Sequence, residues 1–407
     1  MIDNDIVIFG LLASVLAAAY YTRSLGGGWD RFYTFVPIVL VCYLVPSLMA
    51  TFGLIDMSES SLWPIARDAF LPAALFLMCL GIDLNGILRL GPKALIMFFT
   101  ATIGIILGGP IALWLVATYD PQILGEGSSA AWRGLATLAG SWIGGGANQT
   151  AMLEVYQYAP ENYAVMVAVD IVVANIWMAF LLYGAGRPQV FDRWLKADTS
   201  AIDELRDRME SYTASVERVA TPAELMVLIG VTFGIVGLCH LLGGAIGGLF
   251  EDALGAESTL ASPFLWIVFL ATTFGLVGSF TRMRSFEGIG ASRFGTVFIF
   301  LLVLVIGTKM NLLQLSEAPG FMAVGIIWML FHTLLLFAVA KIIRAPFFFI
   351  AVGSKANVGG AASAPVVAGA FHPALAPVGV LLAVLGYALG TYGAIICAEM
   401  MRAVSGM

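Results

Sequence analysis

The chain has 407 residues, of which 60% are hydrophobic and 11% charged, and its formal net charge is −6. Soluble domains contain about 25% charged residues, so this composition, with a mean hydropathy of +0.94, excludes a soluble globular protein. The small net charge also indicates that nucleic acid is not a partner.

Apolar runs recur along the whole chain, and nearly all are long enough to cross a bilayer as a helix. The acidic start, MIDND, lacks the basic region of a cleavable signal peptide, so the first run is expected to remain as a helix. The sequence therefore predicts an all-α, multi-pass protein of a bacterial inner membrane. The expected segments are 5–22, 33–52, 63–82, 90–118, 131–158, 163–184, 223–250, 263–280, 294–312, 319–344, 346–372 and 374–401.

A polar stretch divides these twelve segments into two sets of six, 1–184 and 223–407, joined by a linker at 185–222. Within the linker, apolar residues of 199–219 recur at spacings of three and four, which is typical of an amphipathic helix. We expect this helix on the cytoplasmic side, on the membrane surface or against the protein. A dimer contact is a further interpretation.

The distribution of basic residues tests whether each segment crosses, because cytoplasmic loops are enriched in Lys and Arg. If 131–158 crossed once, the basic clusters of the later loops would all lie outside. If 131–158 instead enters and leaves on the same side, these clusters move to the cytoplasm. The clusters are Arg187, Arg193 and Lys196; Arg282, Arg284 and Arg293; and Lys341 and Arg344.

The same argument makes 346–372 a hairpin that enters from the cytoplasm, with Arg402 as the one charge that disagrees. Each half then has five spans and one glycine-rich re-entrant hairpin, in opposite orientations. This is an inverted-topology repeat, a plan common among secondary transporters. The matching order of Gly81-x-Asp83-Leu84-Asn85 and Gly307-x-Lys309-Met310-Asn311 supports the repeat.

Both predicted hairpins contain glycines and polar residues at their centres: SWIGGGANQT at 141–150 and GSKANVGGAAS at 353–363. Irregular backbone survives at membrane depth only where protein or a water-filled cavity satisfies it. Freed carbonyls and side-chain oxygens suit a cation, and helix N-termini suit an anion. The two tips are therefore expected to meet and form one site, although close helix packing by small residues is an alternative explanation.

Ionisable residues inside spans are candidates for function. Asp170 is predicted to complete a cation site or to carry a proton. Lys355 is predicted to neutralise an anionic substrate, to pair with Asp170, or to anchor the carbonyls of its own hairpin. The predicted substrate-binding residues are Gly145, Gly146, Gln149, Lys355, Asn357, Gly359 and Gly360. The predicted cation-binding residues are Ser141, Asn148, Thr150, Asp170, Asn175, Ser354 and Ser363.

Other polar residues in the apolar runs are given structural roles. Arg67 and Asp68 are interpreted as a local ion pair, and His240 and His332 as packed neutral side chains. The four cysteines show no metal-binding spacing, so neither a disulfide nor a transition-metal site is predicted.

Four stretches, GSWIGGGANQTAM (140–152), VDIVVANIWM (169–178), GSKANVGGAASAPVVAGAF (353–371) and GVLLAVLGYALGTYGA (379–394), resemble the YjcL-like family of predicted integral membrane proteins. The plan with two hairpins is more distantly similar to sodium-dependent citrate and glutamate carriers. That similarity implies an elevator mechanism, in which the hairpins slide against a dimeric scaffold, with Gly144–Asn148 and Asn357–Gly360 as matching positions. The second hairpin departs from that pattern, since it reads NVGG and carries Lys355.

The leading hypothesis is a secondary transporter that couples movement of a small organic solute, carrying a carboxylate, to Na⁺ or H⁺. The alternative is a cation/proton antiporter that uses Asp170 and has no organic substrate. The sequence lacks protease motifs and a Walker A loop, so neither an enzyme nor an ATP-driven pump is expected. No cofactor is predicted beyond Na⁺ as a coupling ion. The expected partners are the substrate, the lipid bilayer and a second copy of the chain.

Overall fold

The computed structural model describes residues 1–407 except 37, 58, 89, 201, 203–204, 206–219, 256–257, 311–317, 373–374 and 407. Most of the predicted amphipathic helix 199–219, as well as Asn311 of the internal match, lies outside the described residues. The helices are α1 (Asp5–Ser24), α2 (Gly28–Phe35), α3 (Ile38–Thr51), α4 (Leu62–Ile65), α5 (Leu71–Leu80), α6 (Leu84–Leu88), α7 (Pro92–Tyr119), α8 (Ala131–Val155), α9 (Tyr163–Ala185), α10 (Pro188–Leu195), α12 (Pro222–Leu254), α13 (Pro263–Ser279), α14 (Ala291–Gly307), α15 (Ala318–Ile343), α16 (Phe347–Asn357), α17 (Gly360–Phe371) and α18 (Ala376–Val404).

The long helices begin where the sequence carries start signals. Thr221 and Glu224 form a capping box at the start of α12, with Pro222 as its first residue. Ser262 caps α13 in the same position relative to Pro263. Within the described residues, seven helical stretches are long and apolar enough to cross a membrane, or eight if the bent pair Pro263–Ser279 and Arg282–Ile289 is one span.

Two expected segments differ in detail. The segment 33–52 is not one helix, because Val36 leaves the helical region (φ −117°, ψ 87°) directly before a proline in the sequence. The segment 63–82 is a single stretch, Leu62–Leu80, with a π-helical turn at Ala66–Phe70. The turn carries Arg67, whose Nε lies 2.8 Å from Glu154 and 3.8 Å from Asp68, so its nearer partner is a distant residue rather than its neighbour.

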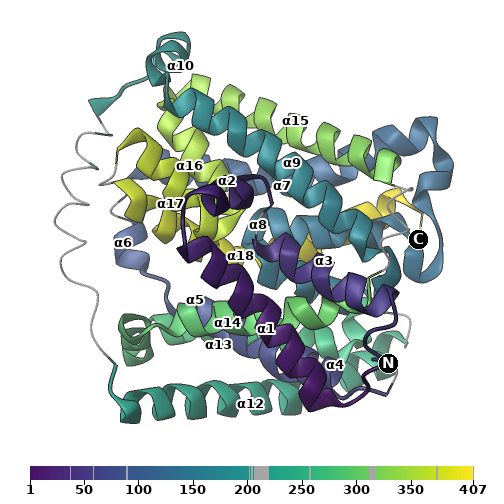
Figure 1. Cartoon of the computed structure of the whole chain (residues 1–407). Helices are drawn as coiled ribbons and strands as arrows, with labels where there is room; N and C mark the ends of the chain where they lie inside the picture. The colour runs from purple at the N-terminus through teal and green to yellow at the C-terminus, as the bar shows by residue number, and fades with distance from the viewer. Residues whose placement is uncertain are drawn as a thin grey trace.

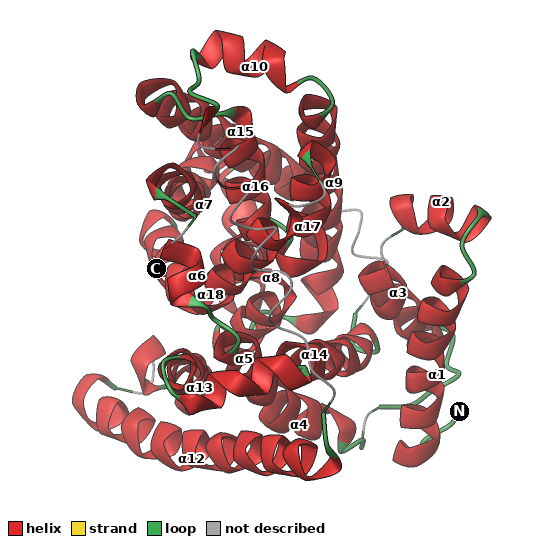
Figure 2. Ribbon diagram, turned by 90° about the vertical axis from the view of Figure 1, so that its left-hand side faces the viewer, coloured by secondary structure: helices red, strands yellow, loops and turns green. Residues whose placement is uncertain are grey.

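The helices form two groups, which can be followed in Figure 2. The scaffold group consists of α1, α3, α5, α12, α13 and α14, and the central group consists of α7, α8, α9 and α15–α18. Hydrogen bonds join the groups at a few points: Thr272 to Thr391 at 2.9 Å, and Thr273 to the hydroxyl of Tyr392 at 2.9 Å.

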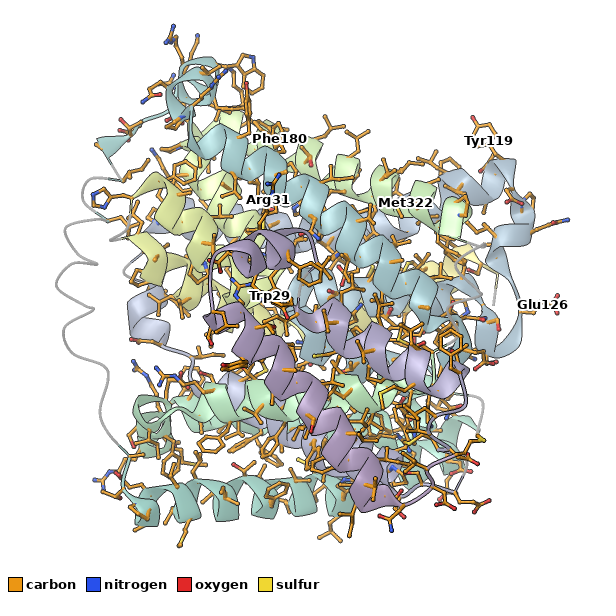
Figure 3. All side chains as sticks on the ribbon, in the orientation of Figure 1. Trp29, Arg31, Tyr119, Glu126, Phe180 and Met322 are labelled. Atoms are coloured by element: carbon orange, nitrogen blue, oxygen red, sulfur yellow. The ribbon has the colours of Figure 1, made fainter. Side chains whose placement is uncertain are left out.

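The molecule has two ends, and the contacts define each of them. At the linker face, Lys93 bonds Asp198 at 2.9 Å, and Asp192 accepts a hydrogen bond from the backbone nitrogen of Phe347. At the terminal face, Glu399 near the C-terminus accepts a 3.2 Å bond from the hydroxyl of Tyr156. Both termini lie on this side in Figure 1, and Tyr119 and Glu126 project there in Figure 3.

Candidate functional site

The first glycine-rich stretch breaks α8 at Gly145. Its φ of 73° and ψ of −172° belong to a region that is essentially restricted to glycine. The ring centroids of Trp132 and Tyr156 are 5.3 Å apart, whereas 24 residues of unbroken helix would separate them by about 36 Å. A Cβ added at Gly140 would lie 2.9 Å from the nitrogen of Gln149. The chain thus reverses at Gly145, and the two arms of α8 pack side by side.

The second glycine-rich stretch breaks the chain between α16 and α17. Val358 has ψ of 82°, and Gly359 and Gly360 have φ of 120° and 59°. Beyond the break the chain again turns back, since the rings of Phe348 and Phe371 are 5.2 Å apart. Glycine is required at both positive-φ positions, because a Cβ would strain the backbone there.

The two breaks meet on α18. A Cβ at Gly145 would lie 3.4 Å from the ring of Tyr387, and one at Gly360 would lie 3.3 Å from the same ring. The preceding residue, Gly386, faces the carbonyl oxygens of Ile143 and Ala356, which would lie 3.0 and 3.1 Å from its Cβ. Tyr387 lies near the middle of α18, so the breaks converge well inside the molecule.

The two broken helices open toward opposite ends of the molecule. Both ends of α8 lie at the terminal face, where Arg133 Nη1 donates a 2.5 Å bond to the carbonyl of Tyr156. The open end of α16 and α17 lies at the linker face. There a cavity of about 190 Å³ is lined by Asp192, Phe348 and Phe371 among others.

Asn148 and Asn357, predicted as cation and substrate ligands, are each held by three hydrogen bonds. Asn148 Nδ2 donates to the carbonyls of Gly144 and Tyr387, both at 3.0 Å, and its Oδ1 accepts from Thr391 at 2.6 Å. The Nδ2 donor therefore bonds the residue four positions back in its own helix, and also a carbonyl of a neighbouring helix. Thr391 lies four residues beyond Tyr387 on α18, so one helix supplies both the carbonyl and the hydroxyl that bind this amide.

The same pattern recurs at the second break. Asn357 Nδ2 donates to the carbonyl of Gly353 at 3.0 Å and to that of Phe98 at 3.3 Å, and its Oδ1 accepts from Thr102 at 2.8 Å. Thr102 lies four residues beyond Phe98 on α7. These amides attach the two breaks to α18 and α7, which fixes where the tips lie.

Asp170 lies beside the first break. One carboxylate oxygen accepts a 2.7 Å bond from Ser141, and the other accepts a 2.7 Å bond from the indole nitrogen of Trp142. The Gln149 amide also faces this carboxylate, but its Nε2 is buried and makes no hydrogen bond to the described residues. Three residues of the predicted site, Ser141, Gln149 and Asp170, are therefore brought together.

Lys355 lies at the second break. It is 3% exposed, and among the described residues it is the only lysine or arginine with a buried side chain. Its Nζ donates a 3.4 Å bond to the carbonyl of Ala174, one turn beyond Asp170 on α9. The buried hydroxyl of Ser363 has no hydrogen-bond partner in the described chain and lies with Lys355 against Gly359.

The other predicted ligands have local roles. Thr150 donates to the carbonyls of Gly146 and Ala147, at 3.1 and 3.0 Å. Ser354 is bonded by the indole nitrogen of Trp177 at 2.8 Å and by His332 Nε2 at 2.7 Å. Asn175 is partly buried and makes no side-chain hydrogen bond within the described residues. Gly146, at the first tip, and Gly359, at the second, are both exposed.

Sequence reasoning missed the residues that hold the site from outside the two broken helices. Tyr387 follows a glycine in a run of small residues, which could have marked a close approach of helices. Trp142 and Trp177 carry indole donors within apolar segments, which was a second available signal. Thr102 and Thr391 offered no such signal.

The matches to known proteins cover most of the chain. Residues 7–404 match the model of a family described as protein of unknown function, DUF819. The chain is 24% identical over 349 residues to the uncharacterized membrane protein YjcL of Bacillus subtilis (strain 168), covering 82% of each sequence. The predicted YjcL-like resemblance is confirmed. With seven apolar helices in the part of the chain that the structure describes, the protein is a multi-pass membrane protein. The chain belongs to the DUF819 family.

Proposed function

We propose that the protein is a secondary active transporter that moves a small organic solute carrying a carboxylate, coupled to Na⁺ or H⁺. The observation that carries this proposal is the convergence of two helix breaks on Tyr387, beside the buried ammonium of Lys355. Broken helices that meet inside a membrane protein are typical of substrate sites in secondary transporters. No chemical step is part of this function.

In this proposal, α8 and the α16–α17 pair are re-entrant hairpins that enter from opposite membrane faces, with the linker face in the cytoplasm. Residues 1–184 and 223–407 are the two inverted repeats. The recurrence of the asparagine–threonine arrangement at both breaks supports this plan. So does the opening of the two pairs of arms toward opposite ends of the molecule.

The central group is proposed to move as one body against the scaffold group, which forms a homodimer in the bilayer. Each break is tied to a helix of the central group, Asn148 to α18 and Asn357 to α7. The hairpins and those helices would therefore move together. The few polar contacts between groups, such as Thr272 to Thr391, would be exchanged during the movement.

The substrate carboxylate is proposed to bind Lys355, the Ser363 hydroxyl and the N-terminus of α17. Three features of this position support an anion: a buried ammonium, a buried hydroxyl without a partner, and the free N–H groups of a helix start. Gln149 offers an unused donor from the first tip. The coupling cation is proposed to bind near Asp170 and Ser141.

A cation/proton antiporter is the second candidate, and the position of Asp170 favours it. A carboxylate inside a predicted span, bonded by Ser141 and Trp142, could exchange a cation for a proton without any organic solute. The two candidates differ in what Lys355 does: it binds substrate in the first and only balances charge in the second.

The test is thermal unfolding of the purified protein with choline salts of formate, acetate, pyruvate, succinate and citrate, with and without NaCl. A bound ligand raises the unfolding midpoint, so the transporter proposal predicts a saturable rise with at least one anion. Lys355→Gln should lose that rise. Lys93→Gln should keep it, because Lys93 pairs with Asp198 at the linker face. A rise with NaCl alone, unchanged in Lys355→Gln and lost in Asp170→Asn, would instead support the antiporter.

A further inference from the structure

Lys355 and Asp170 form an isolated pair of opposite charges between the two breaks. Lys355 lies on α16 and Asp170 on α9, and the electrostatic attraction of Asp170 acts on Lys355. They are not in direct contact, because no carboxylate oxygen of the described chain lies within 4.0 Å of Lys355 Nζ. The hydrogen bond of Lys355 goes instead to the carbonyl of Ala174.

The surroundings of the pair hold no other charge among the described residues that could balance it. The phenols of Tyr43 on α3 and Tyr163 on α9 face Asp170, and their oxygens are 3.4 Å apart. From α8, Ser141, Trp142 and Gln149 face it as neutral groups. His332 on α15 bonds Ser354 and the carbonyl of Ala101. Because a carbonyl only accepts, Nδ1 carries the proton.

The ammonium of Lys355 also faces the start of α17. A Cβ at Gly359 would lie 3.0 Å from Lys355 Nζ and would overlap the hydroxyl oxygen of Ser363. The ammonium and the unpartnered hydroxyl therefore converge on the first turn of a twelve-residue helix. A carboxylate at this position would meet a charge, a hydroxyl donor and helix N–H groups, in competition with Asp170 for the same ammonium.

We propose that this site binds a monocarboxylate anion together with one proton, and that the proton is held by Asp170. The inference rests on the proposed function and adds to it the coupling ion and the charge of the substrate. When the substrate carboxylate pairs with Lys355, Asp170 loses its counter-charge. A hydronium ion of the solution then gives its proton to one oxygen of Asp170, forming an O–H bond and leaving a water molecule, while Lys355 remains an ammonium.

Charge balance is the physical reason for this exchange. The buried site has zero net charge before binding, with Lys355 positive and Asp170 negative. It again has zero net charge afterwards, with a positive Lys355, a neutral Asp170 and a negative substrate. Uncompensated charge inside a membrane protein is costly, so a second carboxylate on the substrate is disfavoured. Transport would be electroneutral and independent of Na⁺.

The test uses the full chain in detergent, with formate, acetate, pyruvate and benzoate as probes and methyl pyruvate and succinate as comparison solutes. The dissociation constant of each probe is measured from pH 6 to pH 8 in choline buffer and in NaCl. Proton uptake is followed with a pH indicator in weakly buffered solution. We expect at least one probe to bind with uptake of one proton, and its Kd to rise about tenfold per pH unit at alkaline pH.

The Asp170→Asn variant distinguishes proton binding by Asp170 from a purely structural role of this side chain. The amide keeps the shape of the protonated acid, and Ser141 can rotate its hydroxyl to accept. The variant should bind the probe with a Kd that is independent of pH and without proton uptake, and at pH 8 more tightly than the unmodified protein. Asp198→Asn, an exposed carboxylate at the linker face, should behave like the unmodified protein.

The outcomes distinguish the two proposals. Anion binding that requires Na⁺ and takes up no proton would overturn the inference and leave the proposed function standing. Equal binding of succinate would overturn the monocarboxylate assignment in the same way. If neither the four probes nor succinate bind at any pH, or if methyl pyruvate binds as well as pyruvate, both proposals are wrong.

Discussion

Asn148→Ala removes the side chain that attaches the first break to α18. The amide is fully buried and makes three hydrogen bonds, to Gly144, Tyr387 and Thr391. The neighbouring Gln149 is a matched control, because it is also buried and its amide nitrogen makes no hydrogen bond to the described residues.

The expected loss follows from the number of bonds. A hydrogen bond contributes a net of about 1 kcal/mol in soluble proteins. In membrane proteins, measured values average about 0.6 kcal/mol. Three bonds therefore give a loss of about 2–3 kcal/mol in the free energy of unfolding for Asn148→Ala. Gln149→Ala also truncates a buried side chain but breaks no such bond, so it should cost less than Asn148→Ala.

The assay is reversible unfolding in mixed micelles, combined with a double-mutant cycle between Asn148→Ala and Thr391→Val. The cycle should give a coupling free energy of at least about 0.5 kcal/mol, because the two side chains share a direct bond. Equal losses for Asn148→Ala and Gln149→Ala, together with additive behaviour in the cycle, would refute the reasoning that this amide holds the break in place.

Three further predictions concern other parts of the structure. Gly145→Ala should destabilise the protein by about 1–3 kcal/mol, because Gly145 has φ of 73°, whereas Gly146→Ala should change little, since the nearest atom to its Cβ would be 4.0 Å away. Equal unfolding midpoints for these two variants would contradict the strained break. Thr102→Val should lower the unfolding free energy about as much as Thr391→Val, because each variant loses two bonds, and unfolding in mixed micelles measures both. Thr102 bonds Asn357 and the carbonyl of Phe98, and Thr391 bonds Asn148 and Thr272. The bond from Ser200 and the ion pair with Lys93 lower the pKa of Asp198 from 3.8 to about 2. A lowered pKa stabilises the folded state above pH 4, and this contribution is lost as the pH falls toward 2. The difference in unfolding midpoint between the unmodified protein and Asp198→Asn should therefore disappear over that range. Because Asp198 is exposed, the difference should be small. A difference that persists at pH 2 would contradict a stabilising ion pair between Asp198 and Lys93.

The two helix breaks could be predicted from the sequence, because glycine runs beside asparagines are unfavourable in continuous apolar helices. The positions of the breaks, at Gly145 and at Val358–Gly360, follow those glycines closely. The division of 33–52 into two helices was also readable from Pro37, whose effect on Val36 outweighs the apolar character of the run.

The roles of the asparagines could not be predicted, because their partners are far away in sequence. Asn148 bonds Thr391 across 243 residues, and Asn357 bonds Thr102 across 255 residues. A polar residue in an apolar segment indicates that some partner exists, but a local pattern does not distinguish a ligand from a neighbouring helix. The convergence on Tyr387 is hidden for the same reason, since it depends on how α8, α16 and α18 pack.

The central claim is that an organic anion crosses the membrane through the site that contains Lys355. The most direct measurement uses the radiolabelled anion that most strongly stabilises the purified protein. Its uptake into liposomes is driven by an inward gradient of Na⁺ or H⁺. The account predicts accumulation above the external concentration by the unmodified protein and by Lys93→Gln, and no accumulation by a folded Lys355→Gln variant. Accumulation by Lys355→Gln equal to that of the unmodified protein would contradict it.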